Sequence, residues 1–213
     1  IFAHFRVYLK EISYPVFSDR RFIVAPDLVF ESTAIRKPIK MHSHFLVMQS
    51  GNLQYGGYFR QRTARIGSVF NASELSAEVG VDVKTITRWL SVLQASYLVT
   101  LLPPYYENIS KRLIKSPKLY FNDTGLACYL LDIESPKQLD RDKMRGALFE
   151  NMIVMEVLKH RYNNGKEGGV FFYRDSNQNE VDILLKQEGE ITALEVKSSM
   201  TYNSSFEKTL KQL

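Results

Sequence analysis

The stretch from Glu180 to Ser199, EVDILLKQEGEITALEVKSS, constrains the fold of this 213-residue chain more than any other. Apolar and polar residues alternate over residues 180–186, with the period of two that is typical of a β-strand. The polar segment 187–190 contains a glycine and predicts a turn, and residues 191–197 predict a second strand. We therefore expect a β-hairpin, which belongs to a sheet and not to a helical bundle.

The same hairpin carries residues that suit a divalent metal. Asp182 lies near the middle of the first predicted strand, and Glu195 and Lys197 are two residues apart on the second, so they share a face. Carboxylate oxygens are hard ligands that suit Mg²⁺ or Mn²⁺, and a lysine can position a water or stabilise charge on a phosphate. The alternative is a solvated hairpin, because these residue types often recur by chance.

A long helix is predicted upstream of the hairpin, over residues 146–162. Phe149, Ile153 and Val157 form one apolar ridge of this helix. Glu150 has apolar residues at helical contact spacings, so it lies on or beside a buried face. Burying a carboxylate is costly unless it is paired or binds a metal. The sequence therefore predicts a partner for Glu150.

Residues 67–126 predict a helix-turn-helix followed by a hairpin. Asn71 or Ser73 can cap a first helix, and Asp82 can cap a second helix that runs through Ser96. A glycine-containing turn separates the two helices, as in helix-turn-helix units. Returning strands over 97–102 and 117–121 make this a winged helix.

This unit offers candidate contacts to nucleic acid. The start of the second helix is where such helices meet base edges, and cations of the hairpin can hold phosphates. The candidates are Lys84, Thr85, Thr87 and Arg88 on the helix, and Lys111, Arg112, Lys115 and Lys118 in the hairpin, with Tyr105 and Tyr106 able to stack on bases. The alternative is that the unit packs against protein and its lysines are merely solvated.

Composition narrows the class of protein. A net charge of +5 fits a polyanionic partner. The single cysteine, Cys128, excludes an internal disulfide framework and fits a reducing cytoplasm. No apolar run approaches the roughly 20 residues that span a bilayer, so we expect no membrane partner. The phosphate-binding pattern G-x-x-x-x-G-K-[S/T] is missing from the sequence.

The chain therefore divides into three predicted parts. Residues 1–66 form an unassigned N-terminal segment, residues 67–135 a winged-helix domain, and residues 136–213 an α/β domain that ends in a helix capped by Ser204. A polar connector over 132–142 joins the last two. The predicted fold class is α/β (α+β), with the winged helix-turn-helix domain preceding the small α/β domain. The first and last segments suggest a fragment of a longer protein.

The order of these motifs resembles the C-terminal half of a prokaryotic AAA-like P-loop ATPase family, in which a winged helix precedes a PD-(D/E)xK nuclease-like domain. The matching text is SELSAEVGVDVKTITRWLSVLQASYLVTLLPPY, SPKLYFNDTGLACYLL, GALFENMIVMEVLK, FFYRDSNQNEVDILL and ALEVKSS. The resemblance covers residues 67–213. It implies that the α/β domain is restriction-endonuclease-like and that an ATPase domain, missing from this chain, is a partner.

The resemblance also implies a complete site. Glu150, Asp182 and Glu195 would be metal ligands for Mg²⁺ or Mn²⁺, and Lys197 would join them as a catalytic residue. We expect them to converge beside a small mixed sheet, with at least one carboxyl pKa raised by mutual repulsion. The predicted function is a DNA-binding, metal-dependent nuclease. The alternative is a non-catalytic nucleic-acid-binding or partner-binding regulatory module of the ATPase.

Overall fold

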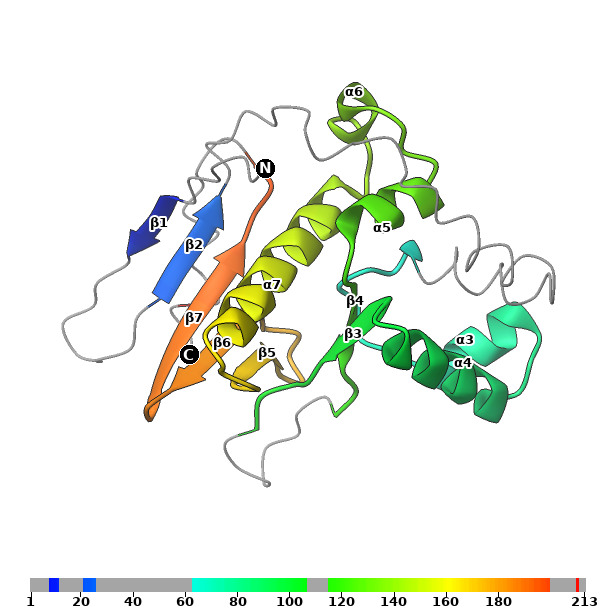
Figure 1. Cartoon of the computed structure of the whole chain (residues 1–213), viewed down its shortest axis with the longest axis horizontal. Coiled ribbons are helices and arrows are strands. Elements are labelled where there is room, and N and C mark those ends of the chain that lie inside the picture. The colour runs from blue at the N-terminus through cyan, green and yellow to red at the C-terminus, as the bar shows by residue number, and fades with distance from the viewer. Residues whose placement is uncertain (1–7, 12–20, 26–62, 107–114, 200–209, 211–213) are drawn as a thin grey trace.

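The computed structural model describes residues 8–11, 21–25, 63–106, 115–199 and 210 (Figure 1). Within these residues the architecture is mixed α+β, with five helices, a five-stranded sheet and a two-stranded sheet. The predicted C-terminal helix after Ser204 lies outside the described residues.

The first two described helices form the predicted helix-turn-helix pair. Helix α3 spans Ala72–Val79, and the Asn71 side chain caps it by accepting from two backbone N–H groups. Gly80 follows with φ 76°, a left-handed conformation that glycine adopts at little cost. Helix α4 spans Val83–Ala95 and is capped by Asp82. Both predicted helices are confirmed. The sequence could predict them because their caps and apolar spacing are local features.

The hairpin after α4 is also confirmed. Strand β3, Val99–Leu102, pairs antiparallel with β4, Lys118–Phe121, and every residue of β4 is buried. Just beyond β3, the Tyr105 N–H donates to the Phe172 carbonyl and the Phe172 N–H donates to the Pro103 carbonyl. The hairpin is therefore attached through its backbone to the edge of the larger sheet.

The larger sheet has the order β1-β2-β7-β6-β5. Its strands are β1 Tyr8–Glu11, β2 Arg21–Ala25, β5 Val170–Arg174, β6 Glu180–Gln187 and β7 Glu190–Val196. The pair β2–β7 is parallel and the other neighbours are antiparallel. The predicted hairpin β6–β7 is confirmed, and the N-terminal segment that the sequence left unassigned contributes two strands beside it.

Three helices connect the hairpin to the sheet. They are α5 Thr124–Leu130, α6 Pro136–Leu139 and α7 Arg145–Asn163. The predicted polar connector over 132–142 contains the short helix α6. Ser135 caps this helix and Pro136 occupies its first turn, where a proline needs no hydrogen-bond partner.

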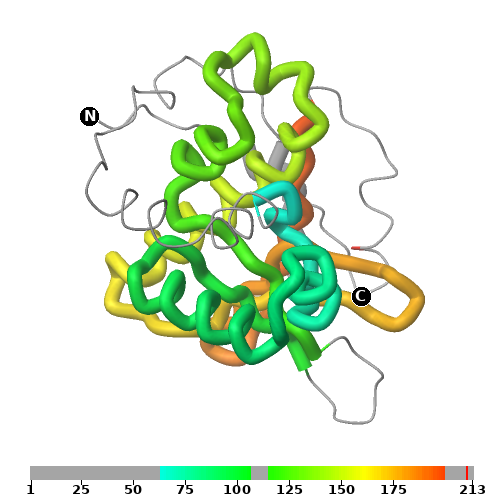
Figure 2. Tube along the Cα trace, turned by 90° about the vertical axis from the view of Figure 1, so that its right-hand side faces the viewer, coloured from blue at the N-terminus to red at the C-terminus, as the bar shows by residue number. Residues whose placement is uncertain are grey.

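Helix α7 lies between the sheet on one side and the hairpin and helix pair on the other (Figure 1). In the perpendicular view α3 and α4 are nearest the viewer, with the sheet behind them (Figure 2). One apolar cluster includes Leu75 of α3, Ile86 of α4, Phe149 of α7 and Ile183 of β6. The parts of the chain before and after the predicted domain boundary at 135–136 therefore share one apolar core. The boundary itself stays a prediction.

Asn151 of α7 makes a buried polar connection inside this core. Its side chain is fully buried; its Oδ1 accepts from the Phe121 N–H at 2.7 Å, and its Nδ2 donates to the Phe121 carbonyl at 2.9 Å. The same Nδ2 also donates to Thr124 Oγ1 at 3.0 Å. The amide thus pairs with the end of β4 as a neighbouring strand would, and it holds α7 against the hairpin.

We expect Asn151→Ala to lower the free energy of unfolding by about 3 kcal/mol, because it removes both buried hydrogen bonds between the Asn151 amide and the Phe121 backbone. Urea unfolding followed by circular dichroism measures this loss. The control is Asn164→Ala at the exposed end of α7, where the loss should stay below about 1 kcal/mol. Equal losses in the two variants would contradict this role for Asn151.

Candidate functional site

The candidate site lies where β6 and β7 diverge. Their ladder ends at the pair Ile183–Leu194. Beyond it, β6 continues beside β5 to Glu180, while β7 continues beside β2 to Val196. The Asp182 carboxylate accepts the Val196 N–H at 2.8 Å, so a side chain takes a place that a strand carbonyl would otherwise fill. We call this point the fork of β6 and β7.

Two buried carboxylates flank the fork. Asp182 and Glu195 are each 7% exposed, and each is adjacent in sequence to the last ladder pair. One oxygen of Glu195 forms an ion pair with Lys197, but its Oε2 is buried and has no hydrogen-bond partner among the residues that the structure describes. An unpartnered buried carboxylate oxygen is costly, so this atom is suited to a ligand.

Glu150 reaches the fork from α7, but β4 holds its carboxylate. Its Oε1 accepts from the Tyr120 hydroxyl at 2.6 Å and from Lys118 Nζ at 3.0 Å. The backbone of Gly67 packs against the same group, because a Cβ there would lie 3.1 Å from Glu150 Oε1. The sequence predicted that Glu150 has a partner, and the structure shows two: the buried Lys118 ammonium and the Tyr120 hydroxyl, both on strand β4.

Lys118 lies among the carboxylates and not on the surface. It is 1% exposed, and its Nζ lies 2.5 Å from a Glu180 oxygen and 3.9 Å from Asp182 Oδ1, in addition to its bond with Glu150. This corrects the prediction that Lys118 contacts nucleic acid. Lys118 is the first residue of β4, a strand in which every residue is buried. Its ammonium therefore lies inside the protein, where the carboxylates balance its charge.

The structure brings Glu150, Asp182, Glu195 and Lys197 into one electrostatic cluster. Burial, followed by Glu150 and then Glu195, raises the pKa of Asp182 well above its ordinary value. Burial also raises the pKa of Glu195, although Lys197 opposes this shift. Burial lowers the pKa of Lys197, but Asp182 and Glu195 outweigh it and raise the pKa overall. A carboxyl pKa is therefore raised in the predicted direction, but burial is a larger cause than the predicted repulsion between the carboxylates.

The predicted set of three metal ligands is only partly present. Among the residues that the structure describes, no group of three His, Cys, Asp or Glu side chains is arranged to hold a metal ion. Glu150 is turned to Lys118 and Tyr120, which explains why the third ligand is missing. Asp182 and Glu195 still fit a hard cation, because Glu195 Oε2 has no other partner.

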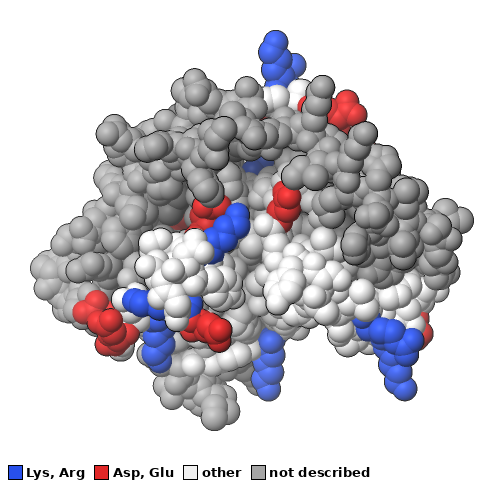
Figure 3. Space-filling view, viewed as in Figure 1, with Lys and Arg blue, Asp and Glu red and all other residues white. Residues whose placement is uncertain are grey.

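The other nucleic-acid candidates divide by exposure. Lys84, Thr87 and Arg88 are exposed on α4, and Lys115 is exposed before β4. Basic side chains project from the end of the molecule that α3 and α4 form (Figure 3). The Thr85 hydroxyl donates to the Asp82 carboxylate at 2.7 Å, so it serves the helix cap.

Two further candidates lie outside the described residues, and one aromatic prediction was wrong. Lys111 and Arg112 belong to the segment 107–114, which the structure does not describe. Tyr105 is 8% exposed and packs edge-on against Phe171, so it cannot stack on a base. Tyr106 is 44% exposed and stays a candidate.

Sequence reasoning did not assign Lys118, Tyr120, Glu180 or Gly67 to the site. A signal was present for some of them. Lys118 and Tyr120 are two apart on a predicted strand, and Glu180 is two residues before Asp182, so each pair shares a face. The sequence alone did not reveal that these faces meet Glu150.

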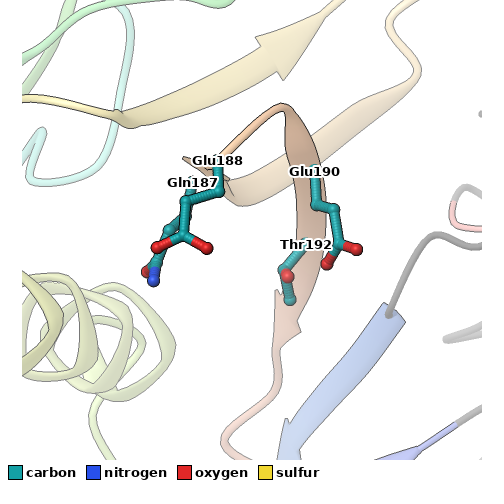
Figure 4. Close-up of a pocket in the computed structure, with 4 residues that line it drawn as sticks. All are labelled: Gln187, Glu188, Glu190 and Thr192. Atoms are coloured by element: carbon teal, nitrogen blue, oxygen red, sulfur yellow. The ribbon is translucent and has the colours of Figure 1, made fainter.

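A polar pocket near the β6–β7 turn is separate from the fork. It is lined by Gln187, Glu188, Glu190 and Thr192 (Figure 4). Gln187 is five residues along β6 from Asp182, which corresponds to about 17 Å of extended strand. This pocket therefore takes no part in the chemistry of the fork.

Comparisons with known proteins match two separate parts of the chain. Residues 52–137 match the family described as Domain of unknown function (DUF8612), and residues 145–213 match Domain of unknown function (DUF4143). The chain is 30% identical over 135 residues to the uncharacterized protein Rv2008c of Mycobacterium tuberculosis and to the uncharacterized protein Mb2031c of Mycobacterium bovis. The match covers 63% of this chain but spans only 30% of each relative's length.

No solved structure matches the chain. Among the described residues, no helix has both the length and the apolar character needed to cross a membrane.

The raised pKa of Asp182 predicts a pH-dependent stability. Between its ordinary value of 3.8 and its raised value, the folded state binds more protons than the unfolded state. The free energy of unfolding should therefore fall as the pH rises from about 4, by up to about 1.4 kcal/mol per pH unit. Urea unfolding at intervals between pH 4 and pH 8 measures this slope.

We expect Asp182→Asn to flatten that slope, because the amide does not titrate and can still accept the Val196 N–H. The control is Asp175→Asn, since the pKa of Asp175 is lowered and its carboxylate is already ionised over this range. A slope in Asp182→Asn as steep as in the wild type would show that another group titrates.

Proposed function

We propose that the chain is the DNA-binding, nuclease-like C-terminal region of a P-loop ATPase, with Asp182, Glu195 and Lys197 at its cleavage site. In this proposal α3 to β4 form a winged helix-turn-helix, and α7 with the larger sheet forms a restriction-endonuclease-like fold. The observation that carries it is Glu195 Oε2, a buried carboxylate oxygen without a partner, at the fork that also holds Asp182. The order of sequence motifs supports the same reading.

Each residue of the fork has a definable part in such chemistry. Asp182 and Glu195 would hold Mg²⁺ or Mn²⁺, which when bound supplies positive charge and lowers the pKa of a water. The Val196 N–H fixes the orientation of Asp182. The Lys197 side chain is 34% exposed and pairs with Glu195, so its ammonium can reach solvent and stabilise charge on a phosphate.

The proposed partners are DNA and an ATPase domain. Lys84, Arg88 and Lys115 are exposed cations on or beside the helix-turn-helix unit and suit a DNA backbone. The ATPase domain would be a separate segment, because the sequence lacks a phosphate-binding loop. A reducing cytoplasm, inferred from the single cysteine, belongs to the same proposal.

Cleavage of supercoiled plasmid in the presence of Mn²⁺ tests the proposal. We expect Asp182→Ala and Lys197→Met each to lower the cleavage rate at least about 100-fold, because they remove a ligand and a charge at the reacting phosphate. Glu156→Gln is the control, since Glu156 is an exposed residue of α7 that pairs with Lys159. Cutting that persists in Asp182→Ala would show a contaminant and would remove the assignment.

DNA binding is tested separately. We expect Lys84→Ala and Arg88→Ala each to weaken binding to all sequences and to reduce the slope of log affinity against log salt by about 1, if the side chain contacts a phosphate. Fluorescence anisotropy of a labelled duplex at several salt concentrations measures both effects. Lys159→Ala, which removes an exposed lysine of α7, is the control, and a matching effect there would contradict a specific DNA-binding face.

One observation favours a second candidate function, a non-catalytic binding or regulatory module of the ATPase. The Lys118 ammonium and the Tyr120 hydroxyl already satisfy Glu150 Oε1, and Lys118 also balances Glu180. This candidate predicts binding to DNA or to a partner without metal-dependent cleavage. Turnover that depends on Glu195 would exclude it.

A further inference from the structure

Lys118 is a charged residue of the fork to which the proposed cleavage chemistry gives no part. Its side chain is 1% exposed and lies 5.4 Å from the centre of the Phe172 ring. A buried ammonium is costly unless nearby groups compensate its charge. Here Glu150, Glu180 and Asp182 provide that compensation.

The ammonium occupies the space that Glu150 and Asp182 share. Lys118 Nζ lies 3.0 Å from Glu150 Oε1 and 3.9 Å from Asp182 Oδ1. A divalent ion held by both carboxylates would lie close to this positive charge, and like charges repel strongly where water is scarce. An ion bound to both carboxylates and an ammonium between them therefore exclude each other.

Glu150 Oε1 has little capacity left for a metal while Lys118 is present. Its Oε1 accepts from both Lys118 and Tyr120, whereas Glu195 Oε2 accepts from no group. Among these two oxygens, the one that is open to a ligand therefore belongs to Glu195 and not to Glu150. A cation that enters the fork would find Asp182 and Glu195 first.

Lys118 is also fixed in place. It begins β4, which pairs with β3 along its length, and the Asn151 amide binds the other end of β4 to α7. The ammonium therefore belongs to the folded framework and does not swing out to solvent as a surface lysine does.

We infer that the Lys118 ammonium competes with a divalent cation for the Glu150 carboxylate and thereby sets the metal affinity of the fork. The inference rests on the proposed function for the class of ion, Mg²⁺ or Mn²⁺. With Lys118 in place, two carboxylates hold the ion. Without the ammonium, Glu150 becomes a third ligand and the net negative charge of the site increases.

Titration of the full chain with Mn²⁺, followed by the electron paramagnetic resonance signal of the free ion, tests this inference. We expect Lys118→Met to bind Mn²⁺ at least tenfold more tightly than the wild type. Lys118→Arg keeps the charge and should stay within about threefold of the wild type. Lys159→Met, which removes an exposed lysine of α7, is the matched control and should not change the affinity.

A second variant keeps the test decisive if Lys118→Met does not fold. Glu150→Gln in the wild-type background should change Mn²⁺ affinity less than about twofold, because Glu150 is already taken by Lys118. A tenfold loss in that variant would overturn the inference. In the Lys118→Met background, Glu150→Gln should abolish the gain in affinity.

The outcomes separate this inference from the proposed function. Wild-type cleavage with no tighter binding in Lys118→Met would overturn the inference and leave the nuclease proposal standing. Tighter binding in Lys118→Met without cleavage by any variant would support the inference and remove the nuclease proposal. If neither protein binds Mn²⁺, the metal site itself is wrong and both are overturned.

Discussion

The attachment of β4 to α7 is the interaction on which the rest of this structure depends. Two consecutive residues of α7 make this attachment. Glu150 accepts hydrogen bonds from Lys118 and Tyr120, and Asn151 pairs with the Phe121 backbone. These contacts are polar, yet they lie within or beside a continuous apolar core. Because buried polar groups are costly when unpaired, the two elements are held in one relative position. The helix-turn-helix unit and the larger sheet are thereby joined.

The fork of β6 and β7 shows how the fold tolerates several acids in a small buried space. Asp182 is stabilised by the Val196 N–H, Glu195 by Lys197, and Glu150 by β4. Two chain segments supply these partners, the end of β7 with the following Lys197 and the strand β4, so the charge balance exists only in the folded protein. The compensation is incomplete, since the pKa values of Asp182 and Glu195 remain raised and one oxygen of Glu195 is unpartnered. Residual negative potential of this kind is what draws a cation to a site.

The same balance bears on both proposed functions. Lys118 compensates the buried carboxylates without a metal, and under our inference the same ammonium would lower the affinity of the fork for a metal ion. The families that match the chain are themselves of unknown function, and the matched relatives are uncharacterized. The two proposed functions therefore rest on the residues of the fork. They differ in whether Asp182 and Glu195 bind a metal ion beside the Lys118 ammonium.

The sequence by itself determined the elements whose signals are local. Helix caps such as Asn71 and Asp82, and the alternation in β6 and β7, act over a few residues, so they could be recognised without the fold. The sequence also pointed to Asp182, Glu195 and Lys197, because the hairpin brings them together. Only the tertiary structure decided what Lys118 does. It meets Glu150 from 32 residues away, and a lysine on a short strand faces solvent or core according to what packs there. Only the tertiary structure likewise placed β1 and β2 in the sheet, because β2 pairs with β7, a strand far along the chain, and such pairing leaves no local pattern in the sequence.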